Sequence, residues 1–216
     1  MRKVINNLIY PSYPAIFACS KCQRPFLFQR TLHIQYKIIV CGQIRLTTVI
    51  FGIEPAVKPA SMVCENPRVL VMATPLTLRE EKFLSLVGRF SDSAEFISLP
   101  CPALVELIET GETESVAIDE YLTKLFTPYK SLPIDAIVLG CTHYPHIKHM
   151  IKKHFPESVK IIDGGEGTAK QTKRRLEELA LLNPDEKGSV EILNSSADPH
   201  ILEISEKLLY INTANA

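Results

Sequence analysis

The clearest pattern in the chain is a series of short apolar runs separated by segments with helical spacing, and it begins at residue 49. Five of these runs predict strands, at residues 49–53, 68–72, 95–99, 137–139 and 159–163. The run Ile137-Val138-Leu139 shows no alternation of apolar and polar side chains, which is typical of a strand buried on both faces of a parallel sheet.

Apolar residues recur at helical spacing between these runs. They predict helices at residues 77–88, 104–111, 115–126, 145–155 and 166–182, and a last strand and helix at 190–193 and 199–210. Thr77 and Glu80 have the spacing of a capping box, which would begin the first of these helices. Strands that alternate with helices predict an α/β fold in which helices flank a parallel sheet.

Residues 1–48 show neither the helical nor the strand period. Two short apolar segments, at 15–18 and 37–40, are candidate strands that each end at a cysteine. We predict no fold for the rest of this part, because its prolines and scattered phenylalanines follow no pattern.

Charge and composition narrow the class of protein. Lys plus Arg and Asp plus Glu number 24 each, so the net charge gives no reason to expect nucleic acid or an anionic membrane as a partner. No apolar run approaches the ~20 residues that a membrane helix needs, and the segment after Arg2 and Lys3 is unlike a secretory signal. We therefore expect a cytoplasmic protein with a small-molecule partner and reduced cysteines.

Cysteine spacing offers one weak metal motif. Cys19 and Cys22 have the spacing of metal ligands, but no second Cys-x-x-Cys or pair of histidines at zinc spacing follows. A four-ligand zinc site is therefore not expected, and we predict no metal.

The candidate chemistry lies at Cys141-Thr142-His143, directly after the predicted strand and Gly140. Open α/β folds bind ligands at this carboxyl edge of the sheet. The beginning of a helix favours an anion, so the pKa of the thiol should fall from ~8.5 toward neutrality. His143 can exchange a proton with the thiol, and Thr142 can bind a substrate carboxylate. In the alternative interpretation, Cys141 is merely a small buried residue and His143 a solvated loop residue.

The segment Leu139-Gly140-Cys141-Thr142-His143-Tyr144-Pro145 resembles the second active-site motif of glutamate racemases. Three further stretches resemble other segments of that family, in the family's order: GIEPAVKPA at 52–60, LPCPALVE at 99–106 and IDGGEGTA at 162–169. The resemblance extends from residue 49 to about 210. It implies an aspartate/glutamate racemase-like α/β lobe over residues 49–182, followed by a strand and helix at 183–216 that pack against a second lobe.

The resemblance also implies a chemistry, the cofactor-independent inversion of glutamate at its α-carbon by two cysteines. Cys141 would be one of them, His143 its proton partner, Thr142 a substrate ligand and Glu106 the acidic residue of this half of the site. The product would be D-glutamate for peptidoglycan, and hence for the cell wall and cell shape. No cofactor is implied, and a homodimer is a candidate assembly.

The amino-terminal half of the family pattern is missing. Its Asp-Ser-Gly, Pro-Tyr-Gly and Cys-Asn-Thr motifs do not occur, and neither Cys19 nor Cys41 is followed by Asn-Thr. We assign neither as the second base. Cys101, between two prolines, could be a second thiol of the site, but a structural role is favoured. Residues 1–48 are therefore expected to be a divergent or truncated remnant, which leaves the second lobe incomplete.

Three hypotheses follow. The first is a glutamate racemase whose turnover is impaired, because a two-base inversion with one positioned base loses the geometry of fast proton transfer. The second is a non-catalytic fragment that folds as a lone α/β lobe. The third is a racemase of aspartate or another small acid.

Overall fold

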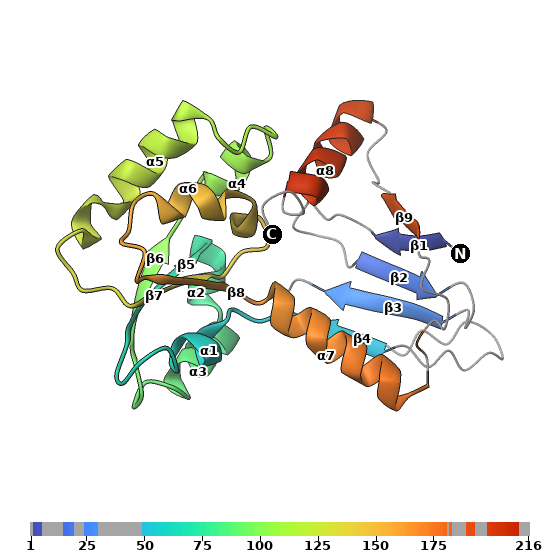
Figure 1. Cartoon of the computed structure of the whole chain (residues 1–216), viewed down its shortest axis with the longest axis horizontal. Coiled ribbons are helices and arrows are strands. Elements are labelled where there is room, and N and C mark those ends of the chain that lie inside the picture. Colours follow the sequence, from blue (N-terminus) through green and yellow to red (C-terminus); the bar gives the residue numbers. More distant parts are fainter. Residues whose placement is uncertain are drawn as a thin grey trace. The chain divides into compact units, whose positions relative to one another are not determined.

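The computed structural model describes residues 2–5, 15–19, 24–29, 49–180, 182, 189–192 and 198–211. Cys22, Cys41 and the candidate strand at 37–40 lie outside these residues. The chain forms two compact units, shown in Figure 1. The α/β unit consists of Glu54–Gly164 with the described residues Tyr210 and Ile211. The mixed-sheet unit consists of the described residues up to Ile53 and of those between Gly165 and Leu209.

The α/β unit is built on a four-stranded parallel sheet in the order β6-β5-β7-β8. Its strands are β5 (Arg68–Ala73), β6 (Glu95–Pro100), β7 (Ala136–Leu139) and β8 (Lys160–Asp163). In the central register, Leu70 lies between Ile97 and Ile137. The predicted parallel sheet is confirmed, and all four residues of β7 are buried, as its unbroken apolar run indicated.

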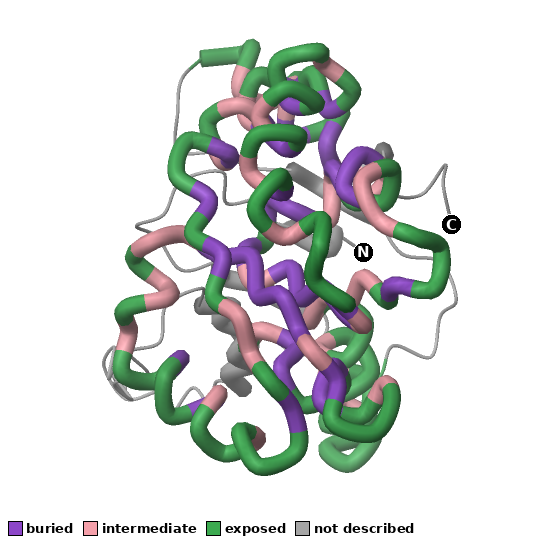
Figure 2. Tube along the Cα trace, turned by 90° about the vertical axis from the view of Figure 1, so that its left-hand side faces the viewer, coloured by how far each residue is buried: buried purple, intermediate pink, exposed green. Residues whose placement is uncertain are grey.

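Helices cover both faces of this sheet (Figure 1). On one face lie α1 (Val57–Ala60) and α3 (Glu81–Gly88); on the other lie α4 (Leu104–Ile108), α5 (Val116–Phe126) and α6 (Lys148–Lys152). Val69 and Val138 pack with Phe83 on the first face. Alternate strand residues point the opposite way, and the central strands β5 and β7 are buried on both faces. Buried segments are purple in Figure 2.

The predicted helix at 77–88 is confirmed in part, because a helix ends at Gly88 as expected, but it is not continuous and its capping box is wrong. Two helices occupy this segment, α2 (Pro75–Arg79) and α3, separated by Glu80 in an extended conformation. The cap is Thr74, whose hydroxyl accepts a hydrogen bond from the Thr77 N–H at 3.3 Å. Pro75 suits the first helical position because it has no N–H to satisfy, so the helix begins before Thr77.

The mixed-sheet unit contains five strands in the order β4-β3-β2-β1-β9. They are β1 (Arg2–Ile5), β2 (Ala15–Cys19), β3 (Arg24–Gln29), β4 (Val49–Gly52) and β9 (Ser189–Ile192). The pairs β1–β2 and β2–β3 are antiparallel, whereas β3–β4 and β1–β9 are parallel. The candidate strand at 15–18 is confirmed as part of β2.

Two helices belong to the mixed-sheet unit, α7 (Gly165–Glu178) and α8 (Pro199–Ile211). This division differs from the predicted lobe at 49–182, because β4 and α7 group with the mixed-sheet unit. The reason lies in strand pairing: β4 hydrogen-bonds to β3, and α7 packs on β4.

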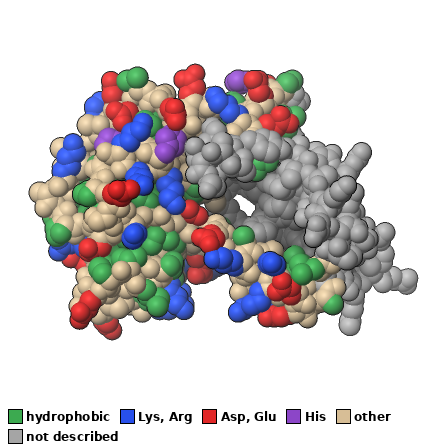
Figure 3. Space-filling view, in the orientation of Figure 1, with side chains coloured by type: hydrophobic (Ala, Val, Ile, Leu, Met, Phe, Trp, Pro, Cys, Tyr) green, Lys and Arg blue, Asp and Glu red, His purple; other side chains and the backbone are tan. Residues whose placement is uncertain are grey.

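Acidic and basic side chains are interspersed over the face of the α/β unit visible in Figure 3, in keeping with their equal numbers in the sequence. None of the helices in the described part of the chain is both long and apolar enough to span a membrane.

Candidate functional site

The candidate site lies where the parallel strands of the α/β unit end. Past the end of β7, the Gly140 N–H donates to the Met72 carbonyl of β5 at 2.8 Å. A Cβ atom on residue 140 would lie only 2.9 Å from that same oxygen, so a side chain has no room there. Glycine thus lets the chain leave the strand against β5 and places Cys141 at the sheet edge.

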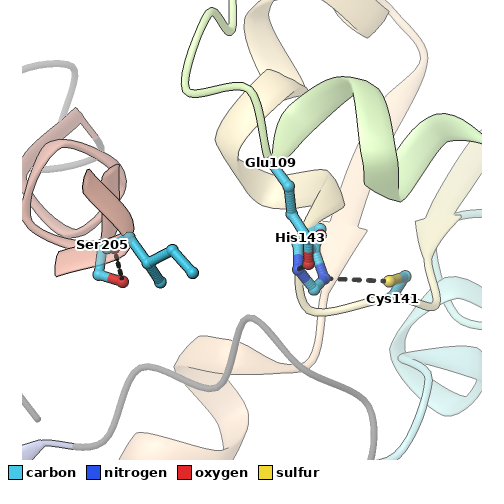
Figure 4. Close-up of polar contacts among 5 residues, drawn as sticks. Glu109, Cys141, His143 and Ser205 are labelled. Carbon is cyan, nitrogen blue, oxygen red and sulfur yellow. Dashed lines mark hydrogen bonds and ion pairs between the residues drawn. The ribbon is translucent and has the colours of Figure 1, made fainter. Parts of the chain in front are cut away.

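Three side chains form a connected array at this edge, drawn in Figure 4. The Sγ of Cys141 lies 3.7 Å from Nδ1 of His143, and Nε2 of His143 lies 3.0 Å from Oε1 of Glu109. Cys141 is 5% exposed and His143 3% exposed. Figure 4 also labels Ser205, which belongs to α8 of the other unit and donates to the Ile201 carbonyl at 2.7 Å.

The order of these groups determines what the array can do. A carboxylate beside one ring nitrogen favours the imidazolium form of His143 and fixes the orientation of its ring. An imidazolium beside a thiol favours the thiolate. The array can therefore move a proton between Cys141 and His143, with Glu109 compensating the charge on the ring.

The structure brings together two of the four predicted site residues, Cys141 and His143. The alternative of a solvated His143 is wrong, because its ring is buried between Cys141 and Glu109. Thr142 lies between them in sequence and is exposed at the sheet edge. The roles of Cys141, His143 and Thr142 in catalysis stay predictions.

The carboxylate that contacts His143 is Glu109, not the predicted Glu106. Glu106 lies one turn earlier on α4 and is exposed. The helical wheel contained a signal for this difference. With Leu104 and Ile108 facing the core, Glu106 falls on the opposite side of the helix, while Glu109 falls nearer the buried face.

The helix expected directly after Cys141 begins later than predicted. The chain first forms the 3₁₀ turn η2 (Tyr144–Ile147), and the α-helix α6 spans only Lys148–Lys152. The dipole of α6 therefore favours a thiolate at Cys141 less than predicted, because the contribution of a helix end falls off within one turn. The group beside the sulfur is the His143 ring.

Cys101 follows β6 at the same edge of the sheet. Its N–H donates to the Ala73 carbonyl at 2.9 Å and its Sγ donates to the Leu99 carbonyl at 3.3 Å. Burial raises the pKa of the Cys101 thiol to about 12, and the nearby Cys141 adds to this effect. Cys101 is therefore a neutral, buried thiol, which supports the structural role favoured from the sequence.

Within the described residues, no group of three or more His, Cys, Asp or Glu side chains could hold a metal ion. The backbone of Cys19 lies at the end of β2.

Comparison with known proteins identifies the relatives of this chain. No protein-family model matches it. A glutamate racemase from Clostridium botulinum is 45% identical over 161 residues, which are 74% of this chain and 62% of the relative. The matched part of the chain is homologous to glutamate racemases. The chain spans 62 to 63% of the length of the first such relatives.

Solved glutamate racemases share the fold. The isoform RacE1 from Bacillus anthracis matches with a TM-score of 0.65 and 24% identity, over 76% of this chain and 62% of that one. A glutamate racemase from Francisella tularensis, in complex with D-glutamate, matches with a TM-score of 0.61 and 24% identity, over 74% and 59%. These likenesses support the parallel sheet with flanking helices.

Proposed function

We propose that this chain acts on glutamate as a cofactor-independent racemase of the two-cysteine type, and that Cys141 is the acid–base group on one face of the α-carbon. One observation carries the proposal. A buried thiol, imidazole and carboxylate are connected at 3.7 and 3.0 Å at a strand end, in a chain 45% identical to a glutamate racemase over 74% of its length.

The contact between Sγ of Cys141 and Nδ1 of His143 supports the following proton steps. Cys141 transfers its proton to Nδ1 of His143 and becomes a thiolate. The thiolate then takes the α-proton: the Cα–H bond breaks, an S–H bond forms, and the electron pair stays on the substrate. Donation of a proton to the opposite face completes the inversion. Because an α-proton is far less acidic than a thiol, N–H donors and exclusion of water must stabilise the developing negative charge.

The proposal for this half of the site also names a substrate ligand, Thr142, and a substrate, glutamate. The exposed Thr142 supplies a hydroxyl and an N–H to a substrate carboxylate. Glutamate is favoured over aspartate because the curated relatives are glutamate racemases and one of the matched structures contains D-glutamate. We also propose, from this homology, that the product is used in peptidoglycan synthesis and that the protein is cytoplasmic.

We further propose that inversion by this chain is slow. The motif that holds the first catalytic cysteine in the family, Cys-Asn-Thr, does not occur, so no residue is assigned to the opposite face. A single positioned base can still remove and return a proton on its own face. The chain should therefore exchange the α-proton of one enantiomer of glutamate faster than it inverts either.

The test separates exchange from inversion. The purified chain is incubated with L- or D-glutamate in D₂O, the loss of the α-proton is followed by NMR, and the enantiomers are separated by chiral chromatography. We expect exchange from one enantiomer to exceed inversion by at least about tenfold, since loss of one positioned acid–base group costs roughly 10²–10⁴ in rate. Cys141→Ser should abolish both.

Two results would contradict the proposal in different ways. Rapid inversion that Cys19→Ser or Cys41→Ser abolishes would show that a second base exists after all. Absence of exchange from both enantiomers would favour the lone, non-catalytic α/β lobe.

A further inference from the structure

The turn from Pro100 to Ala103 decides where Glu109 lies. It joins the end of β6 to α4, and Glu109 is the residue directly after the last turn of α4. Any rotation of α4 about this turn moves the carboxylate relative to His143, since the turn precedes the beginning of α4 and the 3.0 Å contact is made just past its end. The array at the site therefore depends on a short connection from β6 to α4.

The conformation of this connection depends on contacts with other parts of the chain. Ala103 has φ of 62° and ψ of −3°, a left-handed conformation that is uncommon for a residue with a Cβ atom. Helix α4 is only five residues long and has no side-chain cap at its beginning. Helices this short are not stable by themselves, so the orientation of α4 depends on the burial of Leu104 and Ile108 and on contacts around the turn.

Two tyrosine hydroxyls make such contacts with consecutive carbonyl groups of the turn. Tyr144, in η2, donates to the Cys101 carbonyl at 3.4 Å. Tyr121, in α5, donates to the Pro102 carbonyl at 2.5 Å. The two donors come from different elements, and Tyr144 directly follows His143 in sequence. The turn that precedes α4 is thus hydrogen-bonded to the residue that follows His143.

Both hydroxyls keep their protons over the physiological range. Burial raises the pKa of Tyr121 to about 12, and burial also raises the pKa of Tyr144, which is fully buried. Each tyrosine can therefore donate a hydrogen bond to its carbonyl at any pH at which the enzyme would work.

We propose that Tyr121 and Tyr144 are positioning residues for the acid–base array: by binding the carbonyls of Pro102 and Cys101 they fix α4 so that Glu109 reaches His143. This inference rests on the proposed function of the array. It differs from a purely structural role because it predicts that loss of the hydroxyls changes the titration of His143.

The experiment compares Tyr121→Phe, Tyr144→Phe and the double variant with Tyr129→Phe, a matched control in the 3₁₀ turn η1 (Thr127–Tyr129) beyond α5. The titration of His143 is followed by NMR on chain labelled at histidine, with His143→Gln to assign its signal. The rate at which iodoacetamide alkylates Cys141 is measured against pH in the same variants. Neither readout requires turnover.

Glu109→Gln shows how far the His143 titration shifts when the charge of the carboxylate is lost completely. Removing the negative charge should lower the midpoint of the His143 titration by about one pH unit or more, because an opposite charge within about 4–6 Å shifts a pKa by 1–3 units. The double tyrosine variant should lower it in the same direction by at least about half a unit. Adding Tyr121→Phe to Glu109→Gln should cause no further change, because both act through one contact.

The inference is overturned if the tyrosine variants melt at lower temperature but titrate at His143 like Tyr129→Phe. If the double variant does not fold, Tyr121→Phe decides alone, because that side chain is only partly buried and its ring is retained. A shifted titration together with absent α-proton exchange would refute the proposed function and leave the positioning role standing.

Discussion

At the scale of single residues, Glu106 and Glu109 show how much depends on one turn of helix. Glu106 lies within α4 and Glu109 directly follows its end, three positions later, and it is Glu109 that contacts His143. The resemblance to the family implied Glu106 as the acidic residue of this half of the site, whereas the carboxylate in contact with His143 is that of Glu109. The distance of 3.0 Å between Nε2 of His143 and Oε1 of Glu109 identifies the carboxylate that contacts the ring, which the motif match did not.

The pair gives a direct prediction. Glu109→Gln keeps the shape of the side chain but removes the charge that favours the imidazolium, so α-proton exchange should fall at least about tenfold, the effect of one unit of pKa. Glu106→Gln, the matched control on the same helix, should stay within about twofold. Equal losses in the two variants, measured by NMR in D₂O, would contradict the assignment of Glu109.

At the scale of elements, the sequence pattern predicted strands better than helix boundaries. The run Ile137-Val138-Leu139 could only be buried, and β7 is buried throughout. The helix at 77–88 ends at Gly88 as predicted, but its beginning was wrong because Thr77 fits a capping box as well as Thr74 fits a cap, and local pattern cannot tell that Glu80 is extended. That conformation is set by packing, which the local pattern does not contain.

The amino-terminal strands β1 and β3 were missed for a related reason. Arg24–Gln29 contains a proline and flanking polar residues, so its own pattern is weak, yet it pairs with β2 and β4 on its two sides. Pairing between distant segments decides such a strand. The same holds for the site: the sequence predicted Cys141 with His143, two residues apart, but not Glu109, 34 residues from His143.

The Thr74 cap can be tested as an element. Thr74→Ala removes the hydroxyl that accepts from the Thr77 N–H, and the free energy of unfolding should fall by about 1 kcal/mol. Thr123→Ala, at an exposed position within α5, should change it by less than about 0.5 kcal/mol. Urea unfolding measures both. A loss in Thr123→Ala as large as in Thr74→Ala would refute the cap.

At the scale of the whole molecule, His154 links stability to pH. Its side chain is 10% exposed and its ring packs against Phe126, with 5.5 Å between ring centroids. Burial lowers the pKa of His154, and Lys130 and Lys153 lower it further, while Asp119 opposes them. Glu114 pairs with another histidine of this region, His149, at 3.3 Å.

The sign of the effect follows from linkage. Because the folded pKa is below the ordinary 6.5, the unfolded chain binds a proton more readily, and its protonation favours unfolding below that pH. The contribution to stability should be complete above pH 6.5 and lost as the pH falls through the folded pKa. Unfolding in urea from pH 7.5 to 5 should show this loss.

The control is His154→Gln, which has no titrating group at this position and should show a smaller decrease over the same range. An identical pH profile in the two proteins would assign the decrease to other groups.

The division of the chain has a consequence for inheritance. Most of the α/β unit is one stretch, Glu54–Gly164, whereas the mixed-sheet unit is assembled from segments on both sides of that stretch. Cys141, His143 and Glu109 all lie within Glu54–Gly164, so one continuous stretch of the coding sequence specifies the array. Recombination or drift in the flanking codons would therefore leave all three positions in place.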